Sequence, residues 1–234
     1  MTKIAGIIGG IAPESTIAYY RQIIERHREA TGGGNPPIII NSIDLTKMLG
    51  FVSSKNFPQL IDYLSAEMNR LADAGADFGA FASNTPHLVF NEVASRSKIP
   101  LISIVECAAR AAEKLGVKKA GLLGTRFTMQ GRFYPDVFSA RGIEVVAPDE
   151  NDLNYVHDKY MTELVNARFL DDTRAELLRI IGRMRERQGI DAVILGGTEL
   201  PLILDRKMAD VGQVLDTTGI HVQAIVDELT RAER

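Results

Sequence analysis

The sequence is poor in residues that build disulfides and metal sites. Its 234 residues include one cysteine, Cys107, and four histidines that lie far apart. A single thiol forms no disulfide within the chain and no cysteine-rich zinc site, and this usage fits a reducing compartment. No HExxH-like pair of histidines occurs. We therefore expect no metal centre.

Long apolar runs and charge of one sign are also lacking. No stretch of about 18 uninterrupted apolar residues is present, and the N-terminal MTKIAGIIGG lacks the regions of a signal peptide. The 27 basic and 30 acidic residues leave a net charge of -3. These features predict a soluble cytoplasmic protein whose partner is a small molecule or another protein, and neither nucleic acid nor a membrane.

Hydrophobic residues make up 45% of the chain, which is enough to fill a sizeable core. Short β-rich runs such as IAGIIG alternate with longer helical patterns such as PESTIAYYRQIIERHRE along the whole sequence. This alternation predicts an α/β fold with mostly parallel sheets.

Two pairs of segments indicate an internal repeat. KIAGIIGG at residue 3 matches KKAGLLGT at residue 118, a shift of 115, and DFGAFASNT at residue 77 matches DAVILGGTE at residue 191, a shift of 114. We therefore predict two similar α/β lobes, 1–113 and 114–234, related by a pseudo-two-fold axis. A C-terminal helix near 218–232 is expected to cross back to the first lobe, and the active site to lie in the cleft between the lobes.

Four polar loops follow predicted strands: GGIAPEST at 9–16, SNTPH at 83–87, GTRFT at 124–128 and GGTELP at 196–201. Ligands of open α/β sheets bind at such strand ends. Each loop offers hydroxyls, and each precedes a helix whose N-terminus favours an anion. A small substrate with one or two carboxylates fits these loops. The alternative is that the same residues are ordinary helix N-caps.

Nucleotide motifs are absent from these loops. GIIGG lacks the G-x-G-x-x-G spacing, and no G-x-x-x-x-G-K-[ST] occurs. No lysine motif for pyridoxal phosphate is present either, so we expect no cofactor.

The four loops, in this order and spacing, resemble the cofactor-independent aspartate/glutamate racemase superfamily, and within it the aspartate racemase and broad-specificity amino-acid racemase branch. The segments GTRFTMQGRFY and GGTELPLIL are the most specific, and the resemblance covers nearly the whole chain. It implies a PLP-independent isomerase, a homodimer, that acts on an amino acid or dicarboxylate. Two cysteines on opposite faces of the α-carbon exchange its proton in that family.

Both of these cysteines are missing here, because the resemblance places them on Ser83 and Gly197. Ser83 keeps a hydroxyl, which needs an activating base. His87 is either that base or a residue that contacts the lobe interface. Glu199 is either an acid/base or a supporting residue. Cys107 is expected to pack on the sheet from a helix.

The resemblance also assigns substrate contacts, most of them in the four loops. They are Gly10, Ser15, Thr16, Asn84, Thr85, Thr125, Thr128, Thr198 and Lys47. Lys159 and Arg168 are further candidates for binding a second carboxylate. The SID segment before Lys47 is closer to broad-specificity or glutamate-using members, so aspartate is not established as the substrate.

Four functional readings stay open. The first is a racemase of altered mechanism that uses Ser83. The second is a decarboxylase or isomerase, for which one proton donor is enough. The third is a catalytically silent binder of amino acids or dicarboxylates. The fourth is a racemase whose cysteines were replaced deliberately to trap a substrate.

Overall fold

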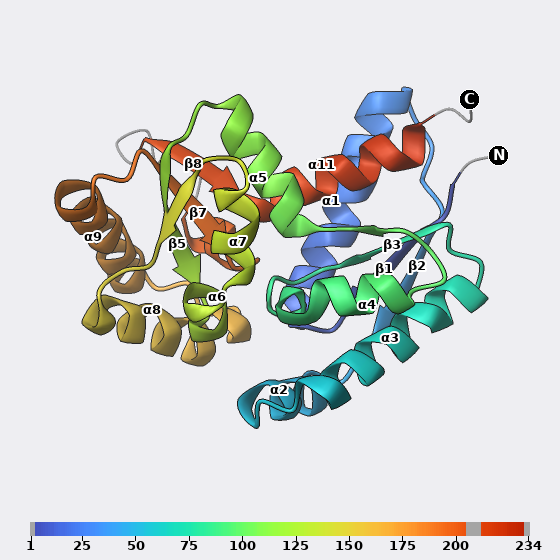
Figure 1. The fold of residues 1–234 in the computed structure, drawn as a ribbon. Coiled ribbons are helices and arrows are strands. Elements are labelled where there is room, and N and C mark those ends of the chain that lie inside the picture. The colour runs from blue at the N-terminus through green and yellow to red at the C-terminus, as the bar shows by residue number, and fades with distance from the viewer. Residues whose placement is uncertain (1–2, 205–211, 232–234) are drawn as a thin grey trace. The chain divides into compact units, whose positions relative to one another are not determined.

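The computed structural model describes residues 3–204 and 212–231. Their contacts divide the chain into two units, Met1–Ile104 with His221–Arg234, and Val105–Ile220. Each unit contains a four-stranded sheet in which all strands are parallel, with helices packed against it (Figure 1). The predicted α/β class is confirmed. The boundary after residue 113 and the pseudo-two-fold relation stay predictions.

The first unit has the strand order β2-β1-β3-β4. Its strands are β1 (Ala5–Gly9), β2 (Ile38–Ser42), β3 (Phe78–Phe81) and β4 (Leu101–Ile102). Its helices are α1 (Pro13–Thr31), α2 (Leu45–Ser53), α3 (Phe57–Asp73), the 3-10 helix η1 (Thr85–Val89) and α4 (Phe90–Arg96). The helix α11 (Thr217–Thr230) spans the second boundary between the units and ends in the first.

One core of the first unit joins β1, β3, α1 and α11. Ile7 of β1 and Phe78 of β3 pack with Ile23 of α1 and with Val222 and Val226 of α11. The last part of the chain thus completes the core that the first strand begins, and α1 and α11 lie on the same side of the sheet (Figure 1).

The second unit repeats this plan with the strand order β6-β5-β7-β8. Its strands are β5 (Lys119–Gly124), β6 (Glu144–Val146), β7 (Ala192–Gly196) and β8 (Gln213–Asp216). Its helices are α5 (Ile104–Lys114), α6 (Arg126–Gln130), α7 (Phe133–Ser139), α8 (Glu150–Thr162), η2 (Leu164–Asn166), α9 (Asp171–Gln188) and α10 (Leu200–Ile203). Its largest core packs α8, α9 and α10 against β5 and β7.

The two strand orders correspond element by element, with β5 in the place of β1 and β7 in the place of β3. The sequence repeat predicts this correspondence. In each unit the two matched strands are neighbours, since Ile8 pairs with Phe81 and Gly124 pairs with Gly196. The polar loops that follow them therefore leave the same edge of their sheet.

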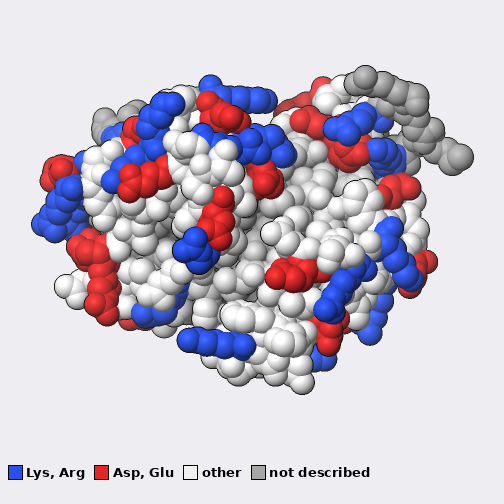
Figure 2. All heavy atoms as spheres, in the orientation of Figure 1, with Lys and Arg blue, Asp and Glu red and all other residues white. Residues whose placement is uncertain are grey.

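The charged side chains are mixed. On the face drawn in Figure 2, lysines and arginines lie among aspartates and glutamates, in keeping with the net charge of -3. Within residues 3–204 and 212–231, no helix is long and apolar enough to cross a membrane.

A buried histidine connects α11 to α1 and β4. The Tyr19 hydroxyl lies 2.9 Å from Nδ1 of His221, and the Ile102 carbonyl oxygen lies 3.0 Å from its Nε2. Since a carbonyl can only accept, Nε2 carries the proton and Nδ1 accepts from Tyr19. Burial lowers the pKa of His221 from 6.5 to about 4. The neutral ring is therefore part of the folded core.

Acid should destabilise the first unit through this group. His221 is protonated near pH 6.5 in the unfolded chain and only near pH 4 in the folded protein. Its contribution to the free energy of unfolding is therefore complete above pH 6.5 and is lost as the pH falls from 6.5 to 4. We expect a loss of about 3 kcal/mol in the free energy of unfolding from this residue. Urea unfolding at several pH values measures it. The variant His221→Gln should be less stable than the unmodified protein at pH 7.5, and its free energy of unfolding should fall less on acidification. Equal falls in the two proteins between pH 6.5 and 4 would contradict this.

Candidate active site

The loop after β1 turns sharply at Gly10. This residue has a φ of 82°, and a Cβ added to it would lie 2.5 Å from the Ile43 carbonyl oxygen, so only glycine fits. Its N–H donates to Thr16 Oγ1 at 2.8 Å. The Thr16 side chain thereby closes the loop onto α1, a structural contact. Ser15 beside it is 2% exposed.

The exit from β3 consists of the three predicted polar residues Ser83, Asn84 and Thr85, and all of them are buried. Asn84 is the N-cap residue of η1, but its side chain makes no capping hydrogen bond there. Ser83 is 7% exposed, Asn84 3% and Thr85 6%. The strand therefore ends in three consecutive buried side chains that can form hydrogen bonds.

His87 follows this exit on η1 and is 3% exposed. Its Nε2 accepts a hydrogen bond of 3.2 Å from the Ile104 N–H, so this nitrogen carries no proton. Burial, and then the nearby His221, lower the pKa of His87 to about 3, although the carbonyls of Asn84 and Ser83 oppose the shift. The ring stacks on Phe90 at 4.8 Å. These contacts give His87 a structural role, and its role as a base for Ser83 stays a prediction.

In the second unit the loop after β5 is a helix cap. Thr125 Oγ1 accepts from the Thr128 N–H at 3.3 Å and lies 3.2 Å from the Thr128 hydroxyl. The capping alternative thus holds at this loop. The next residue, Arg126, donates its N–H to Nδ1 of His157 on α8 at 3.2 Å. Burial, followed by the charge of Arg126, lowers the pKa of His157.

The exit from β7 contains a buried carboxylate. Glu199 is 1% exposed, and its Oε2 accepts hydrogen bonds from the Tyr160 hydroxyl and, at 3.0 Å, from the Thr198 hydroxyl. Burial raises the pKa of Tyr160 well above its usual value, and the negative charge of Glu199 acts in the same direction. The phenol therefore stays protonated and acts as the donor.

The ring of Tyr160 occupies the space that a side chain at residue 197 would need. A Cβ added to Gly197 would lie 2.4 Å from Tyr160 Cε2 and 2.7 Å from its Oη. Real Cβ atoms essentially never approach another heavy atom within 3.0 Å. Gly197 and Tyr160 are thus coupled by volume, because a larger residue at one position requires a change at the other.

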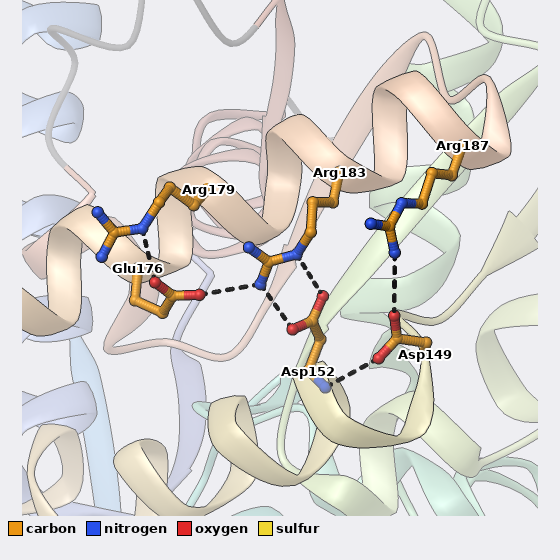
Figure 3. Close-up of polar contacts among 6 residues, drawn as sticks. All are labelled: Asp149, Asp152, Glu176, Arg179, Arg183 and Arg187. Carbon is orange, nitrogen blue, oxygen red and sulfur yellow. Dashed lines mark hydrogen bonds and ion pairs between the residues drawn. The ribbon is translucent and has the colours of Figure 1, made fainter.

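The helix that carries Tyr160 is fixed to α9 by an ionic network (Figure 3). Arg183 of α9 bonds both carboxylate oxygens of Asp152 on α8, at 2.9 and 2.6 Å, and reaches Glu176 at 2.9 Å. A bidentate pair of this kind is geometrically specific. Arg187 lies 3.9 Å from Asp149, which caps α8. The network therefore holds α8 in one position along α9.

Comparisons with known proteins identify the family of the chain. Residues 8–225 match the family model described as Asp/Glu/Hydantoin racemase. The chain belongs to this family. A curated relative is the broad specificity amino-acid racemase RacX of Bacillus subtilis (strain 168), which is 24% identical over 231 residues, 94% of this chain and 96% of that protein.

Two solved structures of the racemase family show the same fold. An aspartate racemase homologue from Pyrococcus horikoshii OT3 is 35% identical, with a TM-score of 0.84 over 99% of this chain and 100% of that one. A glutamate racemase from Francisella tularensis, solved in complex with D-glutamate, is 14% identical, with a TM-score of 0.60 over 99% and 84% of the two chains.

This racemase-family chain has only one thiol, and it lies on α5. Cys107 is buried, and its sulfur accepts a contact of 3.2 Å from Arg110. Neither Ser83 nor Gly197 supplies a thiol at the two strand ends. Whichever proton chemistry these ends perform must use oxygen or nitrogen groups.

The basic residues expected to bind a second carboxylate have other contacts. The Lys47 ammonium lies 4.5 Å from the centre of the Tyr63 ring. Lys159 is paired with Glu163, which also accepts from Thr173 at 2.5 Å. The roles of Lys47 and Lys159 in substrate binding stay predictions.

Tyr160 is the residue that the sequence did not reveal. It lies 37 positions before Gly197, on a helix whose periodicity indicates burial but not which loop it contacts. The sequence did contain one signal, which is Gly197 itself. A glycine at a position where the family has a cysteine leaves a volume that another residue must fill.

The volume coupling predicts a stability effect. Gly197→Ala should lower the free energy of unfolding by about 1–3 kcal/mol, because the new methyl group overlaps the Tyr160 ring. Gly182→Ala is the matched control, since Gly182 lies on α9 with open space around it. This control should raise stability by about 0.5–1 kcal/mol. Thermal unfolding compares the two variants, and equal effects would refute the steric argument.

Proposed function

We propose that the protein is a PLP-independent amino-acid isomerase that exchanges the α-proton of its substrate. The observation that carries this proposal is the exit of β3, where three buried polar side chains follow one another at the carboxyl end of a parallel strand. Burying polar side chains is unfavourable unless they form hydrogen bonds, and a bound ligand can supply such bonds.

The substrate we propose is an amino acid with a free α-carboxylate. Hydrogen-bond donors aimed at that carboxylate stabilise the carbanion that forms when the α-proton leaves. Asn84 and Thr85 are the proposed donors at the exit of β3, and Thr198 is the corresponding residue at the exit of β7. The names of the relatives support this class, since one is a broad specificity amino-acid racemase and another was solved with D-glutamate. A homodimer in the cytoplasm stays a prediction from the resemblance.

A silent binder is the second candidate, and the position of His87 favours it. A serine hydroxyl removes a carbon-bound proton only with an activating base. The unprotonated nitrogen of His87 is already engaged by the Ile104 N–H, so no activation of Ser83 by this ring follows from the contacts. On that reading the protein binds the amino acid and does not turn it over. A decarboxylase or isomerase needs only a donor at Ser83, and a deliberately trapped racemase would also bind without turnover.

Proton NMR in D₂O distinguishes these readings. We expect the purified protein to remove the α-proton signal of at least one amino acid in a panel that includes aspartate and glutamate. Ser83→Ala should slow the exchange of at least one enantiomer at least 100-fold, the usual scale for losing an acid/base group.

The matched control for this measurement is Ser65→Ala, on α3. Ser65 is a buried serine away from the strand ends whose hydroxyl lacks a partner among the described residues, so this variant should exchange normally. Saturable binding without exchange across the panel would reject the isomerase in favour of the binder.

A further inference from the structure

We propose that Tyr160 with Glu199 forms the acid/base group of the second unit and takes the place of the missing side chain at position 197. This inference rests on the proposed function. It assigns proton exchange at the end of β7 to a phenol on α8, because residue 197 has no side chain of its own.

The first argument is position. The Tyr160 hydroxyl lies 2.7 Å from where the Cβ of a residue at 197 would be. A reactive atom on such a residue would stand one bond beyond that Cβ. The phenol oxygen therefore lies in the region where a side chain from the end of β7 would present its functional atom.

The second argument is the partner of the phenol. Tyr160 donates to Glu199 Oε2, and the Thr198 hydroxyl donates to the same oxygen. Both acceptor and second donor belong to the loop after β7. A carboxylate in contact with a phenol gives the proton a place to go, which a phenol in an apolar pocket lacks.

The proton transfers balance without a cofactor. In one direction the phenol oxygen takes the α-proton while its own proton passes to the Glu199 carboxylate, which leaves a carbanion on the substrate, a neutral Tyr160 and a protonated Glu199. In the other direction Tyr160 gives its proton to the carbanion and receives one from Glu199. The strongly raised pKa of Tyr160, caused first by burial, disfavours a lasting tyrosinate and fits this relay.

The third argument is rigidity. A catalytic group works best on an element whose position is fixed. The helix α8 is tied to α9 by the two bonds from Arg183 to Asp152, and Glu176 of α9 holds the same guanidinium (Figure 3). At its other end, Lys159 and Thr173 both bond the Glu163 carboxylate. Tyr160 lies between these two anchor points.

A purely steric role for the ring makes a different prediction. If Tyr160 only fills the space beside Gly197, its hydroxyl is dispensable for turnover. Tyr160→Phe keeps the ring and removes the hydroxyl, so it separates the two roles with little change in packing. Tyr155→Phe, on the same helix, is the matched control.

The experiment follows α-proton exchange in D₂O from the L and the D enantiomer separately. We expect Tyr160→Phe to lose at least 100-fold of the exchange of one enantiomer, to keep that of the other, and to bind the amino acid within about two-fold of the unmodified affinity. Glu199→Gln should give the same one-sided loss. Tyr155→Phe should behave like the unmodified protein.

Two results would overturn the inference, and they differ. Unchanged exchange of both enantiomers by Tyr160→Phe, with the unmodified protein active, would reject the acid/base role and leave the proposed function intact. Absence of exchange by the unmodified protein across the panel would reject the proposed function and the role of Tyr160 with it. Thermal unfolding of Tyr160→Phe and Glu199→Gln verifies that each variant is folded.

Discussion

The parallel pairing of the two central strands in each unit is the constraint on which the candidate site depends. Because β1 lies beside β3 and β5 lies beside β7, loops separated by more than 70 residues leave one edge of each sheet together. Backbone hydrogen bonds along these pairs fix the register, and the buried residues of both strands hold it. Without that register, Ser83 and Glu199 would be ordinary polar residues near the ends of apolar strands.

The sequence was sufficient to predict the fold class and the strand ends, because both follow from short-range patterns. Apolar runs separated by helical periodicity indicated parallel sheets, and the runs ended where the strands end, next to Ser83 and Gly197. The pattern could not separate capping from binding. Thr125 and Asn84 are both N-cap residues, but only the side chain of Thr125 makes a capping hydrogen bond. That difference depends on the backbone angles at each junction, which composition does not encode.

Contacts between distant elements were the other limit. The neutral state of His87 follows from the Ile104 N–H, and the environment of Gly197 follows from a tyrosine on α8. Each partner is set by the packing of a helix against a sheet. The sequence pattern predicts that such residues are buried. Which atom each residue contacts depends on the position and rotation of the helix on the sheet, and the pattern does not give these.

The pairing of Gly197 with Tyr160 also limits the order in which this protein can change. Because the tyrosine ring overlaps the volume of any side chain at 197, a thiol, hydroxyl or carboxylate enters that position only in a chain whose residue 160 is already smaller. Conversely, if the substitution to a smaller residue at 160 comes first, the resulting protein has a cavity beside Gly197. The two positions therefore behave as one epistatic unit, because a larger residue at 197 fits only together with a smaller one at 160.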